Sequence, residues 1–239
     1  MGKVKIKRKS TLIDMTAMSD VTVLLLTFFM LTSTFLQKEP VTVMTPSSVS
    51  EEKVPTANLA SILVSPEGKV FISVAGEADL ANNPQEWGTE EMRKSIIREA
   101  VNEYNKLHPS KKVELTEADV LAFSKINMFG VPFSYLHEFL SKSQTEQDKI
   151  IGDMTNPRVG IPIDDNKDMS KPNEFQIWMR AIRNSGNENI ANAMKKGEGI
   201  AVKADKGTPY ETVHHVLDNL QSLKMNRFAL MTALKTEQD

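Results

Sequence analysis

The chain has 239 residues, of which 40 % are hydrophobic and 25 % are charged, and its formal net charge is −2. This composition is typical of a globular protein and excludes a largely disordered one. The absence of cysteine excludes disulfides, thiolate metal sites and a cysteine nucleophile.

A short tail, residues 1–11, precedes a long apolar segment. Residues 21–37 carry no ionisable side chain, and leucine, phenylalanine and methionine dominate their centre. A helix that crosses the hydrocarbon core of a bilayer needs about 20 largely apolar residues. Because the uncharged run falls slightly short of this length, we expect a transmembrane helix over residues 12–36, starting at Leu12.

The charges on either side of this segment predict its orientation. Five cations stand before it: Lys3, Lys5, Lys7, Arg8 and Lys9. Positive residues in short flanks stay in the cytoplasm, so the amino terminus is predicted to lie inside and the rest of the chain outside. A cleaved signal peptide fits less well, because the apolar core is too long and no small-residue cleavage site follows Leu36. Membrane topology explains the five cations better than nucleic acid does, so no nucleic-acid partner is expected.

Asp20 lies within the predicted helix, on the order of 12 Å along the helix axis from Leu12. A carboxylate at this depth is costly and marks a candidate functional site. A low dielectric disfavours its charged form, so it can take up and release a proton. A single helix cannot enclose a proton path, and a partner with several helices is therefore required. The alternatives are an acid that reaches the membrane surface or a helix N-cap at the membrane edge.

Two hydroxyl side chains follow Asp20 at nearly helical spacing. Thr27 and Thr34 come seven and fourteen residues later, which leaves them close to the helix face that carries Asp20. They are candidates for a polar seam beside the proton path. The alternative is that each hydroxyl bonds to the backbone of its own helix.

Proline and serine mark residues 37–58 as an extended linker, which serves as a spacer or as a switching segment, with a short strand at 41–44. Folded sequence is expected from Leu59. Residues 60–64 and 69–74 are rich in β-forming residues and are joined by a Ser-Pro-Glu-Gly turn, which predicts a hairpin.

The middle of the chain shows mainly helical signals. Thr89 is a plausible N-cap for a helix over residues 90–107, and Thr116 with Asp119 resembles a capping box for a helix that ends near residue 126. Further helices are predicted at 132–140 and 174–183, with a loop at 156–173. The last part predicts a strand at 199–204, a helix at 210–223 and a strand at 227–232, and this order implies parallel neighbours.

Two other segments have features of binding sites. Asp164, Asn166 and Asp168 alternate as in a calcium loop, but Met169 stands where glycine is needed and Phe175 where the bidentate glutamate belongs. The turn at 205–210 suits either binding or fold maintenance, and its residue types favour fold maintenance. No metal site and no cofactor are predicted, and the sequence shows no catalytic triad, so we do not expect an enzyme.

Two stretches resemble the ExbD/TolR family. The first is its transmembrane signature, Ile13-Asp14-Met15-Thr16-Ala17-Met18-Ser19-Asp20-Val21, followed by the leucine-rich run and Phe29-Met30. The signature's single aspartate falls on Asp20, while Ala17 replaces a proline that is usual in the family. The second is the family's closing strand–turn–helix–strand, at residues 200–210 and 228–232.

The resemblance implies a fold, a location and partners. The fold is α+β: one transmembrane helix and a periplasmic mixed-sheet α/β domain, residues 59–239, with a helical insertion at about 77–196. The protein is expected in the inner membrane, as a subunit of a motor driven by the proton motive force. Implied partners are an ExbB-like pentameric channel protein, a TonB-like transducer and a second copy of the chain, with cell-wall peptidoglycan as a further contact of the insertion.

Other functions remain open at this stage. A TolR-like subunit for envelope integrity belongs to the same class of motor. A membrane-anchored periplasmic binding module, with Asp20 incidental, belongs to another class and predicts that Asp20→Asn leaves function intact. An anchored hydrolase is a third alternative.

Overall fold

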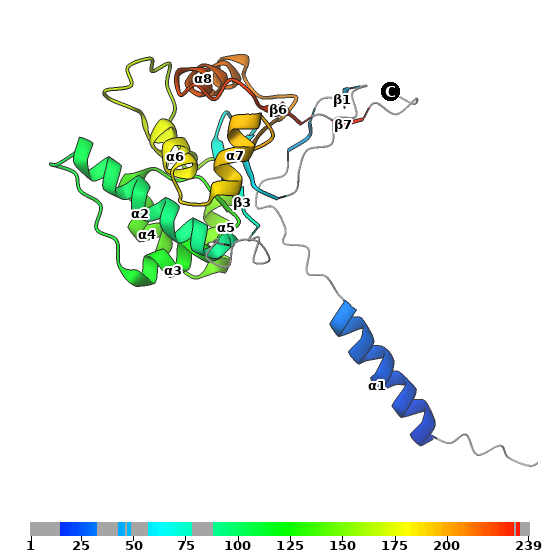
Figure 1. The fold of residues 1–239 in the computed structure, drawn as a ribbon. Coiled ribbons are helices and arrows are strands. Elements are labelled where there is room, and N and C mark those ends of the chain that lie inside the picture. Colours follow the sequence, from blue (N-terminus) through cyan, green and yellow to red (C-terminus); the bar gives the residue numbers. More distant parts are fainter. Residues whose placement is uncertain are drawn as a thin grey trace, which may run out of the picture. The chain divides into compact units, whose positions relative to one another are not determined.

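The computed structural model describes residues 15–32, 43–45, 47–48, 57–77, 88–231 and 233–234 (Figure 1). It divides into two units, Met1–Lys38 and Glu39–Asp239. The first unit contains the 18-residue helix α1 (Met15–Thr32). In the part of the chain that is described, no helix is long and apolar enough to cross a membrane. Residues 12–14 and 33–36 of the predicted transmembrane helix lie outside the described residues.

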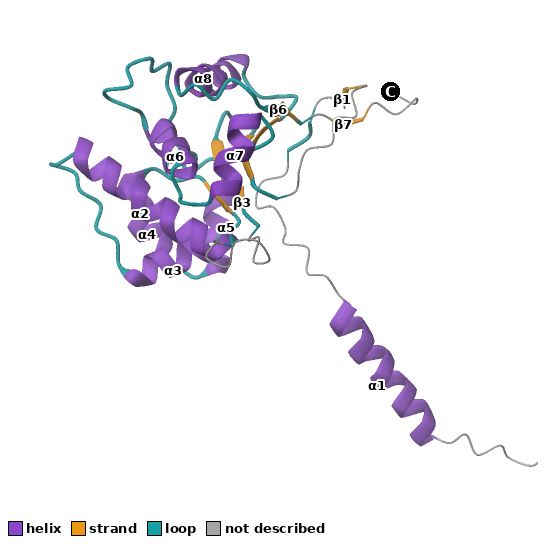
Figure 2. Ribbon diagram, viewed as in Figure 1, coloured by secondary structure: helices purple, strands orange, loops and turns teal. Residues whose placement is uncertain are grey.

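A mixed five-stranded sheet forms the centre of the second unit (Figure 2). Its order is β4-β3-β2-β5-β6, and the strands are β2 (Leu59–Val64), β3 (Val70–Ala75), β4 (Met128–Phe129), β5 (Ile200–Ala204) and β6 (Ala229–Leu230). β2 and β3 form the predicted antiparallel hairpin, whose turn contains Gly68 at a φ of 75°. β5 is parallel to both β2 and β6. The predicted parallel ending is therefore confirmed, although the last strand is shorter than expected.

Seven helices of this unit are described. They are α2 (Thr89–Leu107), α3 (Glu117–Lys125), α4 (Phe133–Leu140), α5 (Gln144–Gly152), α6 (Glu174–Arg183), α7 (Glu188–Lys196) and α8 (Tyr210–Ser222). The capping box of Thr116 and Asp119 is present at the start of α3, as predicted. α5 and α7 were not predicted; each is a nine-residue polar helix that buries only two side chains.

The prediction of Thr89 as the N-cap of α2 is wrong. Gly88 is the N-cap, and Thr89 is the first residue of the helix. The Thr89 hydroxyl instead accepts a hydrogen bond from the Gly76 N–H at 3.0 Å and donates one to the Gly76 carbonyl at 2.5 Å. The Thr89 hydroxyl therefore bonds to the end of β3 and does not cap α2.

The predicted insertion is not purely helical and shares one core with the rest of the unit. It supplies β4, which extends the sheet beside β3. α2 packs against α3 and α6, and α6 also contacts α7 and α8. A cluster of buried aromatic rings joins four of its elements: Phe123, Phe129, Phe133 and Trp178. The insertion is therefore part of the hydrophobic core of the domain.

The strand expected at residues 41–44 is not found in its described part, because residues 43–45 form no strand. Residues 41–42 lie outside the described residues. A strand pair appears slightly later instead, where β1 (Ser47–Ser48) runs parallel to β7 (Ala233–Leu234). The middle of the linker thus pairs with a segment that follows the closing strand.

Candidate functional site

Asp20 is the only ionisable residue of α1, and its side chain is exposed. It makes no hydrogen bond or ion pair with any residue that the structure describes. The large apolar side chains of α1 are more than half exposed, among them Leu24, Phe28 and Leu31. α1 thus presents one carboxylate on an otherwise uncharged helix whose apolar surface is not covered within its own unit.

Three hydroxyl side chains of α1, those of Ser19, Thr22 and Thr27, bond to the helix backbone. Thr27 Oγ1 donates to the Leu24 carbonyl at 2.9 Å, and Ser19 Oγ donates to the Met15 carbonyl at 2.7 Å. Such bonds satisfy a hydroxyl without a partner from another element. The Thr27 oxygen retains a lone pair, and Thr27 lies on nearly the same face as Asp20, because seven residues are close to two helical turns. The polar seam therefore stays a prediction, and Thr34 lies outside the described residues.

The turn after β5 holds the linker against the domain. Asp205 Oδ2 accepts a hydrogen bond from the Met44 N–H at 2.6 Å, and the Lys206 N–H donates to the Met44 carbonyl at 2.9 Å. Asp205 Oδ1 also closes the turn by accepting from the Gly207 N–H at 2.8 Å. Asp205 thus stabilises its own turn, as fold maintenance predicts, and in addition binds Met44, which precedes it by 161 residues in the chain.

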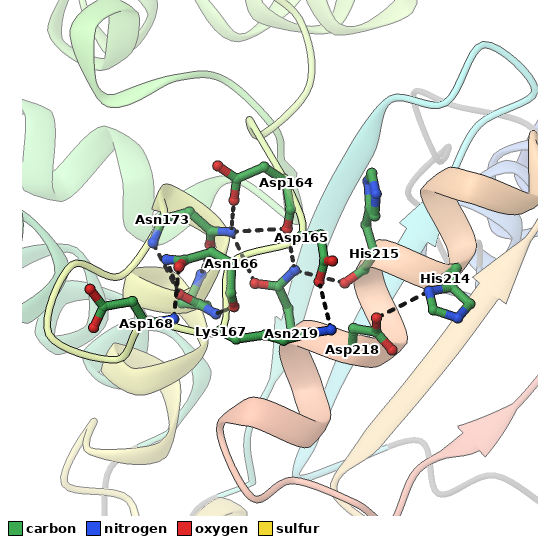
Figure 3. A network of polar contacts seen from close by, with 11 residues as sticks. Asp164, Asp165, Asn166, Lys167, Asp168, Asn173, His214, His215, Asp218 and Asn219 are labelled. Carbon is green, nitrogen blue, oxygen red and sulfur yellow. Dashed lines mark hydrogen bonds and ion pairs between the residues drawn. The ribbon is translucent and has the colours of Figure 1, made fainter.

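A network of amide side chains links the insertion to α8, as Figure 3 shows. Asn219 of α8 is fully buried, and its Nδ2 donates to the carbonyls of Asp164 and His215, each at 2.7 Å. Its Oδ1 accepts from Asn173 Nδ2 at 2.9 Å, and Asn173 also donates to Asp164 Oδ1 at 2.6 Å. Sequence reasoning missed this network. The available signal was an amide at position 219, between the buried Val216 and Leu220.

The loop that resembles a calcium site is held by its own side chains. Gln176 Nε2 donates to the Asn166 carbonyl at 2.8 Å, and Asn166 Oδ1 accepts from the Asp168 N–H at 2.9 Å. Asp168 Oδ1 accepts from the hydroxyl and the N–H of Ser170, and these bonds hold the pKa of Asp168 below its ordinary value. Among the described residues, no three His, Cys, Asp or Glu side chains come together as metal ligands. The oxygens of this loop serve its conformation.

The chain matches the family model described as biopolymer transport protein ExbD/TolR over residues 7–235. The chain belongs to the ExbD/TolR family. Neither a curated protein nor a solved structure matches it. Since the match runs nearly from end to end, it takes in α1, the sheet and the insertion. It does not separate the ExbD members from the TolR members.

ExbD/TolR proteins are inner-membrane subunits of transport motors. They generally work with ExbB/TolQ and TonB/TolA partners. In this ExbD/TolR protein, the Asn219 network joins the closing helix α8 to the loop before α6. The insertion is therefore hydrogen-bonded to α8, which belongs to the segment that resembles the family's carboxy-terminal motif.

Another polar pair of the insertion belongs to a helix cap. Asp119 Oδ2 accepts from the Thr116 N–H at 2.9 Å and lies 2.8 Å from His137 Nδ1. Burial acts to raise the pKa of Asp119, but the hydrogen bonds from Thr116 and the contact with His137 together hold it below its ordinary value. The pair joins the start of α3 to α4 and so stabilises the packing of these two helices.

Replacing Asn219 by alanine is expected to loosen the junction between the insertion and α8. The change removes the hydrogen bond that Asn219 donates to the Asp164 carbonyl and the one that it accepts from the Asn173 amide. We expect this to cost about 2–3 kcal/mol of unfolding free energy. Urea denaturation of the purified protein measures this loss, and hydrogen exchange should speed up in residues 164–173. Asn102→Ala, on an exposed position of α2, is the matched control. Equal stabilities for the two variants would contradict a coupling role.

Proposed function

We propose that this protein is the proton-handling subunit of an inner-membrane motor that energises outer-membrane import through a TonB-like transducer. Asp20 is the carboxylate that carries the proton. The observation that supports this most is the single acid of α1, which has no partner in the described chain and is followed by an uncharged apolar surface. Each proton that falls through 100 mV releases about 2.3 kcal/mol, which is enough to bias a conformational change.

In this proposal residues 12–36 span the inner membrane, with α1 at their centre. The five cations before Leu12 keep the amino terminus in the cytoplasm, and residues 59–239 form the periplasmic domain. Residues 37–58 are the periplasmic linker between them. The contact between Met44, within this linker, and the Asp205 turn supports a defined attachment of the linker to the domain.

The proposal requires partners that complete the proton path. An ExbB-like pentameric channel protein surrounds the helices of two copies of this chain and covers their exposed apolar side chains. Thr27 and Thr34 then extend the polar face of Asp20 within that channel. A TonB-like transducer receives the motion, and the insertion contacts peptidoglycan or a partner protein. A TolR-like subunit that maintains envelope integrity is the alternative in the same class.

Purification tests the assembly. The full chain, tagged and extracted in a mild detergent, is expected to bring down a protein with several transmembrane helices in excess over itself. Mass spectrometry identifies that protein and the transducer, and it separates a TonB-type from a Tol-type system. Recovery of periplasmic proteins alone, without any multi-helix membrane protein, would favour an anchored binding module instead.

Protease added to spheroplasts is expected to digest everything beyond the linker and to spare the amino-terminal tail. The five cations before Leu12 are the physical reason, because they keep the short flank in the cytoplasm. Immunoblots against tags at each end measure the outcome, and intact cells, whose outer membrane excludes the protease, are the control. A protected carboxy-terminal domain would refute the orientation.

A further inference from the structure

A cavity of about 290 Å³ lies in the insertion between the end of α2, the loop before α6 and the first residues of α6. Tyr104, His108 and Lys111 line it from α2 and the turn that follows, and Asp164, Asn173 and Glu174 line it from the other side. Its volume is near the lower limit of ligand pockets in proteins, which indicates a small ligand.

One wall of the cavity is a column of stacked rings that is anchored in the core. His108 stacks on Tyr104 with ring centroids 4.5 Å apart, and Tyr104 stacks on Phe133 at the same distance. Phe133 stacks in turn on the fully buried Trp178 at 4.8 Å. His108 Nδ1 lies 3.2 Å from the Tyr104 carbonyl, which leaves Nε2 as the unoccupied nitrogen of the ring.

The opposite wall is fixed by hydrogen bonds. Asn173 caps α6 by accepting from the Gln176 N–H at 2.9 Å, and it donates to both Asp164 and Asn219. Figure 3 shows Asp164 and Asn173 side by side in this network. A cavity whose walls are already ordered costs a ligand little conformational entropy on binding.

Charged groups of both signs line the cavity without neutralising one another. Glu174 Oε2 accepts from the Phe133 N–H at 2.8 Å, and Asp164 Oδ1 accepts from Asn173, but no described residue donates a hydrogen bond to the second oxygen of either carboxylate. Lys111 Nζ likewise has no partner in the described chain, and no ion pair joins His108 to Glu174. Burial raises the pKa of Glu174, while the Phe133 N–H and nearby His108 oppose this.

We propose that this cavity binds a small zwitterion, either a free amino acid or a dipeptide. Its ammonium group donates to the unused oxygens of Glu174 and Asp164, and its carboxylate accepts from Lys111 Nζ and, when the imidazole carries both protons, from His108 Nε2. The ammonium group meets two carboxylates and the carboxylate meets the Lys111 ammonium group, and charge-assisted hydrogen bonds of this kind are stronger than neutral ones. The proposal does not depend on Asp20 or on the motor function.

Ligand-observed NMR by saturation transfer, with the full-length protein in detergent micelles, tests the proposal. The probes are alanine, alanylalanine and the N-acetyl methylamide of alanine, which has the same side chain but no charge. Acetate and methylamine carry one charge each. The two zwitterions are expected to bind and the uncharged compound is not, while acetate and methylamine bind at least tenfold more weakly than alanine. A preference between alanine and alanylalanine distinguishes a free amino acid from a dipeptide.

Two variants probe the two halves of the site. Glu174→Gln keeps an oxygen for the Phe133 N–H, and Lys111→Gln changes an exposed side chain that no fold contact uses. Each is expected to weaken zwitterion binding about tenfold, as the loss of one charge-assisted bond would do. Lys125→Gln, at the exposed end of α3, is the matched control and should bind as the parent protein does.

Three results would overturn the proposal. One is a zwitterion that binds no better than the uncharged compound. Another is acetate or methylamine binding as tightly as alanine, because a single charge would then account for the site. The third is unchanged affinity in Lys111→Gln, which decides the question even if Glu174→Gln does not fold.

Discussion

Replacing Asp20 by asparagine is expected to abolish energised transport while the protein still assembles with its partner. Asparagine keeps the size and the hydrogen-bonding capacity of the side chain but has no proton to take up or release. Without this proton, the roughly 2.3 kcal/mol available per charge at 100 mV cannot be coupled to movement. In a TonB-type system, the loss is measured as growth that depends on outer-membrane import. In a Tol-type system, it is measured as sensitivity to detergent.

Thr27→Val is the matched control for Asp20→Asn. Valine has nearly the shape of threonine, and the Thr27 hydroxyl bonds to the Leu24 carbonyl of its own helix. Retained transport with Thr27→Val, together with complete loss with Asp20→Asn, would place the function on the carboxylate alone. A strong loss with both variants would favour the polar seam. Normal transport with Asp20→Asn would refute the motor proposal and favour the alternative function, an anchored binding module.

Replacing Trp178 by alanine is expected to cost about 3–5 kcal/mol of unfolding free energy. Trp178 is fully buried, and its ring contacts those of Phe123, Phe129 and Phe133. These rings come from α3, β4 and α4, so the cavity left by alanine separates four elements at once. A domain of this size should lose on the order of 10 °C in Tm, which circular dichroism on heating measures.

Trp178→Phe is the control for this prediction. Phenylalanine retains a stacked ring and removes the indole N–H, which is buried without a hydrogen-bond partner. Its cost should therefore be well below that of alanine. If Trp178→Ala changed only the helices of the insertion and left the unfolding of the sheet unaltered, the insertion would be an independent unit rather than part of one core.

Local signals in the sequence determined much of this fold. The limits of α6 are those predicted, because an amphipathic pattern begins directly after a capping residue, Asn173. The hairpin of β2 and β3 followed from two β-forming runs and a Pro–Gly turn. The capping box of α3 and the order of β5, α8 and β6 were predicted for the same reason: each depends on residues that are close together in the chain.

The singular acid of α1 was also a property of the sequence, since it needs only a count of charges along an apolar run. By contrast, contacts between distant segments were decided by the tertiary structure. The Thr89 hydroxyl, which was expected to cap α2, bonds instead to Gly76 at the end of β3. β4 has only two residues, and it is a strand because β3 offers it an edge.

The amide network and the cavity have the same origin. Asn219 lies 46 residues from Asn173 and 55 from Asp164, and no local pattern relates these positions. A polar side chain on a buried helix face is stable only if the fold brings partners to it. The sequence by itself determined where the elements lie and which residue of α1 is charged. Which polar groups meet was decided only when the helices of the insertion packed against the sheet and α8. The reason is that the buried Asn219 can bond only to groups that the fold brings to it.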